Sequence, residues 1–326
     1  MTALHRDSVL VSVVLPTYQR PTHLRRAIDS VVAQTYENWE LIVVDDNDTG
    51  SDFRRETQEL MEQYAHDPKI RYVQRKTNGG GGAARNTGIQ SASGDYVAFL
   101  DDDDEWLASK LAEQVACFQS SPDIVGAVYT GTSVVNAENG RPYIASARYA
   151  GDLSPRILAG NLIGTTSTIM CRRSAFLEAG LFDERLAAAQ DLDLYIRLAQ
   201  RHHFACIDKP LVVRNKHGGA RITSNLRNKV EAFEIIRRKY ATSYSQHPKM
   251  HSRFLLNEAK LLMAEGDGRT SVKKLLHAMR LDPLNVSLLR YLLPALVGPA
   301  GYRAVQLSTR PLRLFVHRAL RAIGAR

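Results

Sequence analysis

The sequence predicts an α/β protein with a doubly wound, mainly parallel sheet and helices on both faces. Runs of β-branched and aliphatic residues alternate with segments of helical periodicity over the first hundred residues. These strand-like runs are apolar throughout, which is typical of parallel strands buried on both faces. Acidic or polar residues follow several runs directly, and open α/β sheets bind their ligands beyond the carboxyl ends of the strands.

The predicted elements of the first half alternate between strand and helix. The first strand, 9–15, leads to a helix at 22–33, in which Leu24, Ala27, Ile28 and Val31 have helical spacing. The further elements are strands at 41–44, 70–73 and 96–100, and helices at 52–65 and 83–92. This alternation favours parallel pairing with helical crossovers.

From Ala127 the pattern loosens. We predict short strands at 127–129, 168–171, 205–207 and 211–213, and helices at 106–119, 155–159 and 191–200. We expect this half to shape the pocket of a second substrate. Beyond Gly219 the sequence becomes helical to the end, so we place a domain boundary near residue 225.

Composition excludes several classes of protein. The 326 residues are 44% hydrophobic and 24% charged, as in a soluble globular protein. Cys117, Cys171 and Cys206 form no CxxC pair, so we expect neither a disulfide framework nor a zinc site. Residues 1–7 lack the apolar stretch of a signal peptide, and residues 288–297 fall short of the roughly 20 residues that span a bilayer. These features predict a cytoplasmic protein.

The basic charge belongs to the C-terminal part. Residues 225–326 hold 19 Lys and Arg against 6 Asp and Glu, whereas residues 1–224 hold 24 against 28. Residues 302–326 carry six arginines, no acid and apolar residues at near-helical spacing. This pattern favours either a peripheral contact with the anionic inner face of a membrane or a helix packed on the protein with solvated arginines. We expect no nucleic acid partner, because no zinc finger or RNA-recognition motif accompanies the charge.

Four consecutive aspartates, Asp101–Asp104, follow the apolar strand at 96–100. Adjacent carboxylates repel one another unless a cation compensates them. Their hard oxygens suit Mg²⁺ or Mn²⁺, which proteins commonly hold together with substrate phosphates. The alternative is a solvated acidic start to the helix at 106–119, with Asp104 in its first turn. The residues alone leave both interpretations open.

Two further segments before the acidic run have a functional and a structural interpretation. Asp45 and Asp46 end a strand, where they can accept hydrogen bonds from a nucleotide base or ribose, or belong to the turn that residues 47–50 predict. Residues 79–82 are glycines before a helix of small residues. They allow the backbone to approach a phosphate, or they form a mobile linker.

Asp191 opens the helix at 191–200. It can act as a general base towards an acceptor hydroxyl, or it can serve as an N-cap. Asp193 and Arg197 have the spacing of an ion pair within one helix.

Six segments, taken together and in order, resemble the family 2 glycosyltransferases of the GT-A fold. They are Val11–Tyr18, Val43–Asp46, Ala83–Ile89, Gly94–Asp104, Gly180–Glu184 and Gln190–Leu198. The resemblance covers residues 9–220, and the ordered set is more specific than any one motif. It implies an inverting, nucleotide-sugar-dependent enzyme. Its donor would be a nucleoside-diphosphate sugar, with UDP-sugar favoured, and its acceptor a hydroxyl of a glycan or lipid-linked molecule in polysaccharide and cell-surface synthesis.

The resemblance also implies a role for individual residues. Asp191 would remove the acceptor proton, and Asp103 would be the main carboxylate ligand of Mn²⁺ or Mg²⁺. His217 would complete the metal shell or touch the diphosphate, and its alternative is a solvated loop histidine. The donor-binding set is Pro16, Thr17 and Tyr18 in the base pocket, Asp46 at the base, Arg85 near the donor, and Asp101 and Asp102 near the ribose. The family more often has Glu-Asp where this chain has Gln190-Asp191. The glutamine removes one carboxylate that could contact the acceptor, whereas Asp191, the residue that would act as the base, is present.

The predicted organisation is a catalytic domain, 1–224, followed by a basic helical region, 225–326, which could also form an oligomer surface. Within the catalytic domain, residues 1–105 form the nucleotide-sugar-binding half and residues 106–224 the acceptor-binding half.

Two other classes of function remain as alternatives. A sugar nucleotidyltransferase would need a glycine-rich phosphate loop after the first strand, where this chain has Pro16-Thr17-Tyr18. A non-catalytic glycan- or nucleic-acid-binding protein would not need both Asp103 and Asp191.

Overall fold

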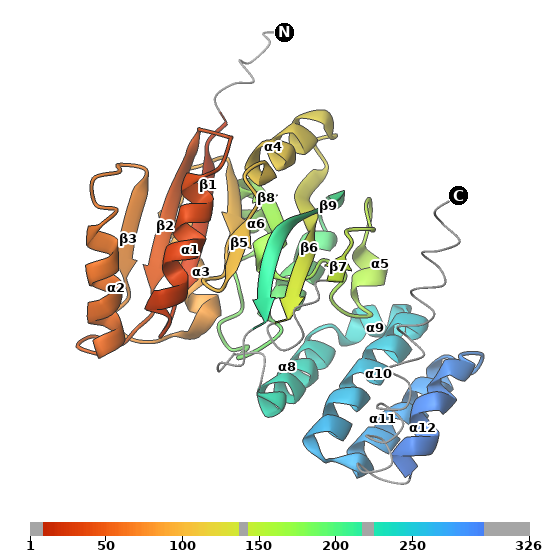
Figure 1. Ribbon diagram of the computed structural model, residues 1–326. Helices are drawn as coiled ribbons and strands as arrows, with labels where there is room; N and C mark the ends of the chain where they lie inside the picture. The colour runs from red at the N-terminus through yellow and green to blue at the C-terminus, as the bar shows by residue number, and fades with distance from the viewer. Residues whose placement is uncertain (1–8, 137–142, 217–224, 297–326) are drawn as a thin grey trace. The chain divides into compact units, whose positions relative to one another are not determined.

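The computed structural model describes residues 9–136, 143–216 and 225–296 (Figure 1). The chain forms two compact units. The first comprises Met1–Ile157 and Asn161–Ala220, and the second comprises Leu158–Gly160 and Arg221–Arg326. In the described part of the chain, none of the helices is long and apolar enough to cross a membrane.

The first unit is built on one sheet, which has nine strands within the described residues. Its strand order is β3-β2-β1-β4-β8-β6-β9-β5, with β7 beside β6. The strands are β1 Val11–Thr17, β2 Trp39–Asp45, β3 Ile70–Gln74, β4 Tyr96–Phe99, β5 Asp104–Trp106, β6 Val125–Asn136, β7 Tyr143–Ala145, β8 Ile169–Arg172 and β9 His203–Lys216.

Strands β1 to β4 pair in parallel, as the alternating pattern predicts. The second half is mixed, because β8 runs antiparallel to both β4 and β6, while β6 and β9 are parallel. The prediction of two separate strands at 205–207 and 211–213 is wrong, since both segments belong to a single strand, β9. Its pairing with β6 shifts register around Gly131, opposite Pro210, so the strand continues through an irregularity that accommodates a proline.

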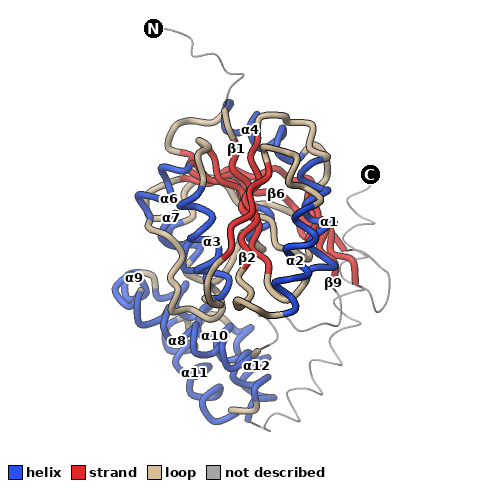
Figure 2. Tube along the Cα trace, turned by 90° about the vertical axis from the view of Figure 1, so that its left-hand side faces the viewer, coloured by secondary structure: helices blue, strands red, loops and turns tan. Residues whose placement is uncertain are grey.

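Helices cover both faces of this sheet (Figure 2). α1 and α2 lie on one side of it, and α3, α6 and α7 lie on the other. The predicted apolar face of α1 is buried through Leu24, Ala27, Ile28 and Val31. The helices of this unit are α1 Pro21–Val32, α2 Asp52–Glu62, α3 Gly80–Ser91, α4 Lys110–Ser120, α5 Ser154–Ile157, α6 Arg173–Ala179 and α7 Gln190–Ala199.

The helix predicted at 106–119 begins later than expected. Residues Asp104–Trp106 form strand β5, which pairs with β9, and α4 starts at Lys110. The interpretation of Asp104 as a first-turn helix acid is therefore wrong. The physical reason is non-local, because the partner strand lies about a hundred residues away and leaves no trace in local periodicity.

The second unit is helical. Its helices are α8 Leu226–Lys239, α9 Ala241–Gln246, α10 Pro248–Glu265, α11 Gly268–Leu281 and α12 Leu289–Leu296. Apolar residues of α10, α11 and α12 pack together, among them Ala259, Leu275 and Leu292. Glu258 is buried in this unit, where it accepts a hydrogen bond from Nζ of Lys274 at 2.6 Å.

Candidate active site

The carboxyl ends of β1, β2 and β4 meet at one edge of the sheet. Thr17, the last residue of β1, pairs with Asp45 of β2, and Val14 pairs with Phe99, the last residue of β4. The acidic run after β4 therefore lies beside the segment that follows β1. Helix α3 packs closely against β1. Gly88 allows this close approach, since a Cβ at that position would lie 2.2 Å from Cγ1 of Val14.

The segment after β1 contacts the acidic run directly. The Thr17 hydroxyl donates to Oδ2 of Asp102 at 3.0 Å. The guanidinium of Arg20 bridges two carboxylates, with Nη1 at 3.2 Å from Asp102 and 3.1 Å from Asp103. Pro16 is half-buried and Tyr18 is 38% exposed, so the Tyr18 ring is accessible from solvent.

Two members of the acidic run have raised pKa values. Burial raises the pKa of Asp102 to about 7, although Arg20 acts in the opposite direction. Burial and the charges of Asp101 and Asp103 raise the pKa of Asp104 well above its ordinary value. Burial is therefore the main cause of both shifts, and neighbouring carboxylates add to it.

Asp101 is held by an arginine and two hydroxyls. Nη2 of Arg85, from α3, lies 2.5 Å from Oδ1 of Asp101. The hydroxyls of Thr165 and Thr166 each donate to the same carboxylate at 3.0 Å. Burial acts to raise the pKa of Asp101, but Arg85 and these hydrogen bonds outweigh it, so the pKa lies below its ordinary value.

The carboxylate of Asp46 is bound by two backbone N–H groups and an arginine of the same chain. Its carboxylate accepts hydrogen bonds from the backbone N–H groups of Gly79 and Gly80, at 3.0 and 2.8 Å, and lies 2.8 Å from Nε of Arg75. Burial raises the pKa of Asp46 against these partners. The glycine segment is thus anchored at the start of α3, beside the carboxyl edge of the sheet.

Two residues other than glycine have a left-handed backbone in the described part of the chain, Gln19 at φ 56° and Ala189 at φ 52°. Gln19 follows the segment after β1, and its N–H donates to Oδ1 of Asn47 at 2.8 Å. Ala189 directly precedes the first turn of α7, which holds Asp191. Backbone strain of this kind is retained where surrounding contacts fix the chain, and it often marks functional sites.

Asp191 lies in the first turn of α7 and is half-buried. Its Oδ2 accepts a 2.6 Å hydrogen bond from Nδ2 of Asn161, and its Oδ1 accepts the N–H of Leu192 at 2.9 Å. Burial raises the pKa of Asp191, while the Leu192 N–H and the charge of Arg85 act in the opposite direction.

Segment 161–167 contacts several of the site carboxylates, although no sequence motif marks it. The Asn161 amide donates a hydrogen bond to Asp191, and the hydroxyls of Thr165 and Thr166 donate to Asp101. The Ser167 hydroxyl donates to Asp104 at 2.7 Å. The available signal was the run Thr165–Thr168, four hydroxyl side chains directly before a strand. Periodicity carries no information about which carboxylate such hydroxyl groups contact.

Other polar residues of the motifs are structural. Asp193 and Arg197 form the expected pair within α7, at 3.0 Å, and Arg197 also donates to three carbonyls at the end of α6, those of Ala179, Gly180 and Leu181. Asn86 exchanges two hydrogen bonds with the backbone of Phe182. The contacts of Asn86 with Phe182 join two motifs that are 96 residues apart in sequence.

The donor set of the acidic run suits a hard cation. Its carboxylates are clustered, and the cationic guanidinium of Arg20 already bridges Asp102 and Asp103. Among the residues that the structure describes, no group of three or more His, Cys, Asp or Glu side chains converges as a complete metal site. His217 lies outside the described residues. The oxygen donors therefore fit Mn²⁺ or Mg²⁺ in their chemistry, with further ligands needed from substrate phosphates.

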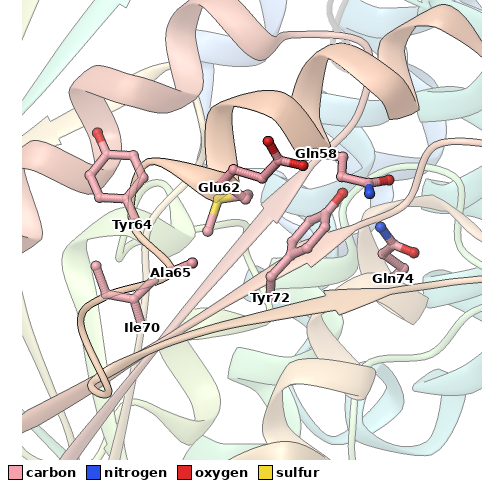
Figure 3. Close-up of a pocket in the computed structure, with 8 residues that line it drawn as sticks. Gln58, Glu62, Tyr64, Ala65, Ile70, Tyr72 and Gln74 are labelled. Carbon is pink, nitrogen blue, oxygen red and sulfur yellow. The ribbon is translucent and has the colours of Figure 1, made fainter.

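A separate pocket lies between α2 and β3 (Figure 3). Its volume is about 340 Å³, and it is lined by Gln58, Met61, Glu62, Tyr64, Ala65, Ile70, Tyr72 and Gln74. None of these residues belongs to the predicted site. The Tyr72 hydroxyl donates to Oδ2 of Asp45 at 2.5 Å, so this wall of the pocket is tied to the end of β2.

Comparison with known sequences identifies the family. Residues 12–180 match the profile of Glycosyl transferase family 2. The chain is 30% identical to WcaA of Escherichia coli (strain K12) over 78% of this chain and 90% of the relative, and the name of that relative assigns it to colanic acid biosynthesis. It is 39% identical to WfgD of Escherichia coli over 34% of this chain and 41% of the relative. WfgD is named a UDP-Glc:alpha-D-GlcNAc-diphosphoundecaprenol beta-1,3-glucosyltransferase. The chain therefore belongs to glycosyltransferase family 2, and it is an enzyme of the glycosyltransferase class.

Solved structures agree on the fold. Staphylococcus aureus TarS 1-349, in complex with UDP-GlcNAc, superimposes with a TM-score of 0.69 at 20% identity, over 92% of this chain and 91% of that chain. The mannosyltransferase PcManGT from Pyrobaculum calidifontis, in complex with GDP-Man and Mn²⁺, gives a TM-score of 0.56 at 18% identity, over 92% and 86%. The predicted GT-A-like α/β fold with C-terminal helices is confirmed.

Proposed function

We propose that this protein is an inverting glycosyltransferase that moves a sugar from a UDP-sugar to a hydroxyl of a glycan or lipid-linked acceptor. One observation carries the proposal. The segment 161–167 contacts Asp191 at one end and the acidic run at the other, so an acceptor-side base and the donor-side carboxylates belong to one hydrogen-bonded network. A single displacement needs these two functions on opposite sides of one anomeric carbon.

On the donor side, Pro16, Thr17 and Tyr18 line the base pocket with Asp46, whose anchored glycine segment borders it. Asp101 and Asp102 lie near the ribose, and Arg85 lies near the donor. Arg85 and Arg20 hold these carboxylates in place, at 2.5 and 3.2 Å. The arginines also bring positive charge to a region that must receive a nucleoside diphosphate.

On the acceptor side, Asp191 removes the proton of the acceptor hydroxyl. The hydroxyl oxygen attacks the anomeric carbon, its new bond to carbon forms as the bond to the diphosphate oxygen breaks, and the configuration inverts. The nucleoside diphosphate leaves with the electron pair of the broken bond. The raised pKa of Asp191 suits this role, because a more basic carboxylate is a better proton acceptor while it stays ionised.

The proposal includes a divalent cation, with Asp103 as its main protein ligand and His217 as a second one. When bound, Mn²⁺ or Mg²⁺ would neutralise the charge that develops on the leaving diphosphate. Asp102 and Asp104 belong to the same acidic run, and burial is the main cause of their raised pKa values.

The names of two relatives support a place in cell-surface polysaccharide synthesis. WcaA is named for colanic acid biosynthesis, and WfgD for transfer from UDP-Glc to a sugar on diphosphoundecaprenol. A lipid-linked acceptor would bring the enzyme to the cytoplasmic face of a membrane. The basic segment 302–326, predicted to contact that face, lies outside the described residues.

Turnover of a donor panel tests the proposal. Wild-type protein with Mn²⁺ should release UDP from one of UDP-glucose, UDP-galactose or UDP-GlcNAc, and a matching donor should raise the melting temperature by mass action. The Asp103→Asn variant should lose metal-dependent donor binding in calorimetry. The Asp52→Asn variant is the matched control, because the Asp52 side chain is 77% exposed in α2. Absence of turnover with every donor, GDP-mannose included, with and without polyprenyl-diphosphate glycans, would contradict the proposal.

A further inference from the structure

The side-chain amide of Asn161 has a defined orientation. Its Oδ1 accepts the backbone N–H groups of Ile163 and Gly164, at 2.9 and 2.8 Å. Its Nδ2 donates to the carbonyl of Gly164 at 2.8 Å. A flipped amide would place N–H against N–H and oxygen against carbonyl oxygen, so the network selects one orientation.

That orientation directs the second N–H of the amide at Asp191. The distance from Nδ2 of Asn161 to Oδ2 of Asp191 is 2.6 Å, short for a hydrogen bond and consistent with an ionised acceptor. The other oxygen of Asp191 accepts the N–H of Leu192 in its own helix. Both oxygens of the carboxylate are thus held, one by a loop and one by a helix, and its rotation is restricted.

We propose that Asn161 is the positioning residue for the base, fixing the Asp191 carboxylate in the orientation that receives the acceptor proton. The inference rests on the proposed function of Asp191. Gly164 supports the arrangement, because its φ of 101° closes the turn around the amide and is a conformation that other residues rarely adopt. Asn161 itself has no group that accepts or donates a proton in the reaction.

An uncharged partner suits a base. A guanidinium at this position would stabilise the ionised carboxylate strongly and lower its proton affinity, whereas an amide orients it with a smaller effect. The charged and titratable groups that act on Asp191 are Arg85 of α3 and Asp101 after β4, from neighbouring elements, and Tyr195 of its own helix α7. Removal of the Asn161 N–H would take away one donor to the ionised form, so the pKa of Asp191 would rise.

The test compares Asn161→Ala and Asn161→Asp with wild type. We expect kcat for transfer to fall about 10- to 100-fold in Asn161→Ala, the effect of one hydrogen bond to a charged group, with the dissociation constant of the UDP-sugar unchanged. The acid limb of the pH profile should move to higher pH, and further in Asn161→Asp, because two carboxylates would then share a proton. Asn225→Ala is the control, since Asn225 is an exposed asparagine that caps a backbone N–H of α8 in the same way.

A double variant separates positioning from other roles. If Asn161 acts through the base, adding Asn161→Ala to Asp191→Asn should leave the residual rate of Asp191→Asn unchanged. A further loss in the double variant, or normal kcat and an unmoved pH profile in Asn161→Ala, would overturn the inference. Full transfer by Asp191→Asn would instead overturn the proposed function of the base, so the two failures are distinguishable.

Discussion

The donor and acceptor sides of the candidate site hold their carboxylates by different means. On the donor side each carboxylate contacts an arginine: Asp46 with Arg75, Asp101 with Arg85, and both Asp102 and Asp103 with Arg20. On the acceptor side, Asp191 accepts from the Asn161 amide and from a backbone N–H. The donor-side carboxylates thus combine arginine contacts with hydrogen bonds from neutral groups, whereas the two hydrogen bonds to Asp191 both come from neutral groups.

The two sets of contacts fit two different chemical roles. A carboxylate that binds hydroxyls, N–H groups or a cation must stay ionised, and a neighbouring guanidinium favours the ionised form. A carboxylate that acts as a base must take up a proton during the reaction, so strong stabilisation of its charge would slow it. The lowered pKa of Asp101, where Arg85 and hydrogen bonds outweigh burial, and the raised pKa of Asp191 follow this division. Asp46 and Asp102 depart from it, because burial raises their pKa values despite the neighbouring arginines.

Replacement of the base should have the largest effect. In Asp191→Asn we expect kcat to fall by about 10²- to 10⁴-fold, the usual contribution of a general base, because the amide cannot accept the hydroxyl proton. Donor affinity should remain near that of wild type, since Asp191 lies on the acceptor side. Single-turnover kinetics and calorimetry measure the two quantities. A loss of donor affinity equal to the loss of rate would erase the distinction between the two sides.

Removal of a donor-side guanidinium should weaken binding instead. In Arg85→Met the Asp101 carboxylate loses its ion pair, and we expect the donor dissociation constant to rise about 10- to 100-fold, with kcat at saturating donor changed less. Titration calorimetry with the UDP-sugar gives the binding constant. Arg55→Met is the control, because the pair of Arg55 with Asp52 is exposed and contributes little. A kcat defect at full donor affinity would place Arg85 with the acceptor machinery.

The pH dependence of kcat/KM for the acceptor should report the ionisation of Asp191. Because burial raises the pKa of Asp191, the fraction of ionised base declines at a higher pH than for an ordinary aspartate. We expect kcat/KM for the acceptor to fall about tenfold for each pH unit below that pKa and to level off above it. Circular dichroism at each pH controls for unfolding. An activity that stays constant down to pH 4 would show that the base is an ordinary aspartate or another group.

The smallest effect is expected from a single hydroxyl. Thr165→Val removes one donor to Asp101 and leaves Arg85 and Thr166 in place. We expect donor affinity to fall about 2- to 10-fold, the value of one hydrogen bond. Thr242→Val, an exposed threonine in α9, is the control measured in the same binding assay. A loss as large as that of Arg85→Met would mean that the hydroxyls, rather than the charge, hold the donor-side carboxylate.

Much of the fold was predictable because its causes are local. The apolar strands β1, β2 and β4 and the buried stripe of α1 follow from periodicity within a few residues. The errors arose where distant segments meet. Strand β5 exists because Asp104–Trp106 pair with β9, and β9 is continuous because β6 pairs with it on both sides of Pro210.

Side-chain chemistry and spacing are properties of the chain, so the residue pattern is enough to identify a family 2 glycosyltransferase with acidic groups after its strands. The partner of each carboxylate depends on the three-dimensional fold. Thr17 and Asp102 are 85 residues apart in sequence, and Asn161 and Asp191 are 30 apart. Contacts over such separations depend on strand register and on how α7 and the 161–167 segment pack together, and no local pattern records them.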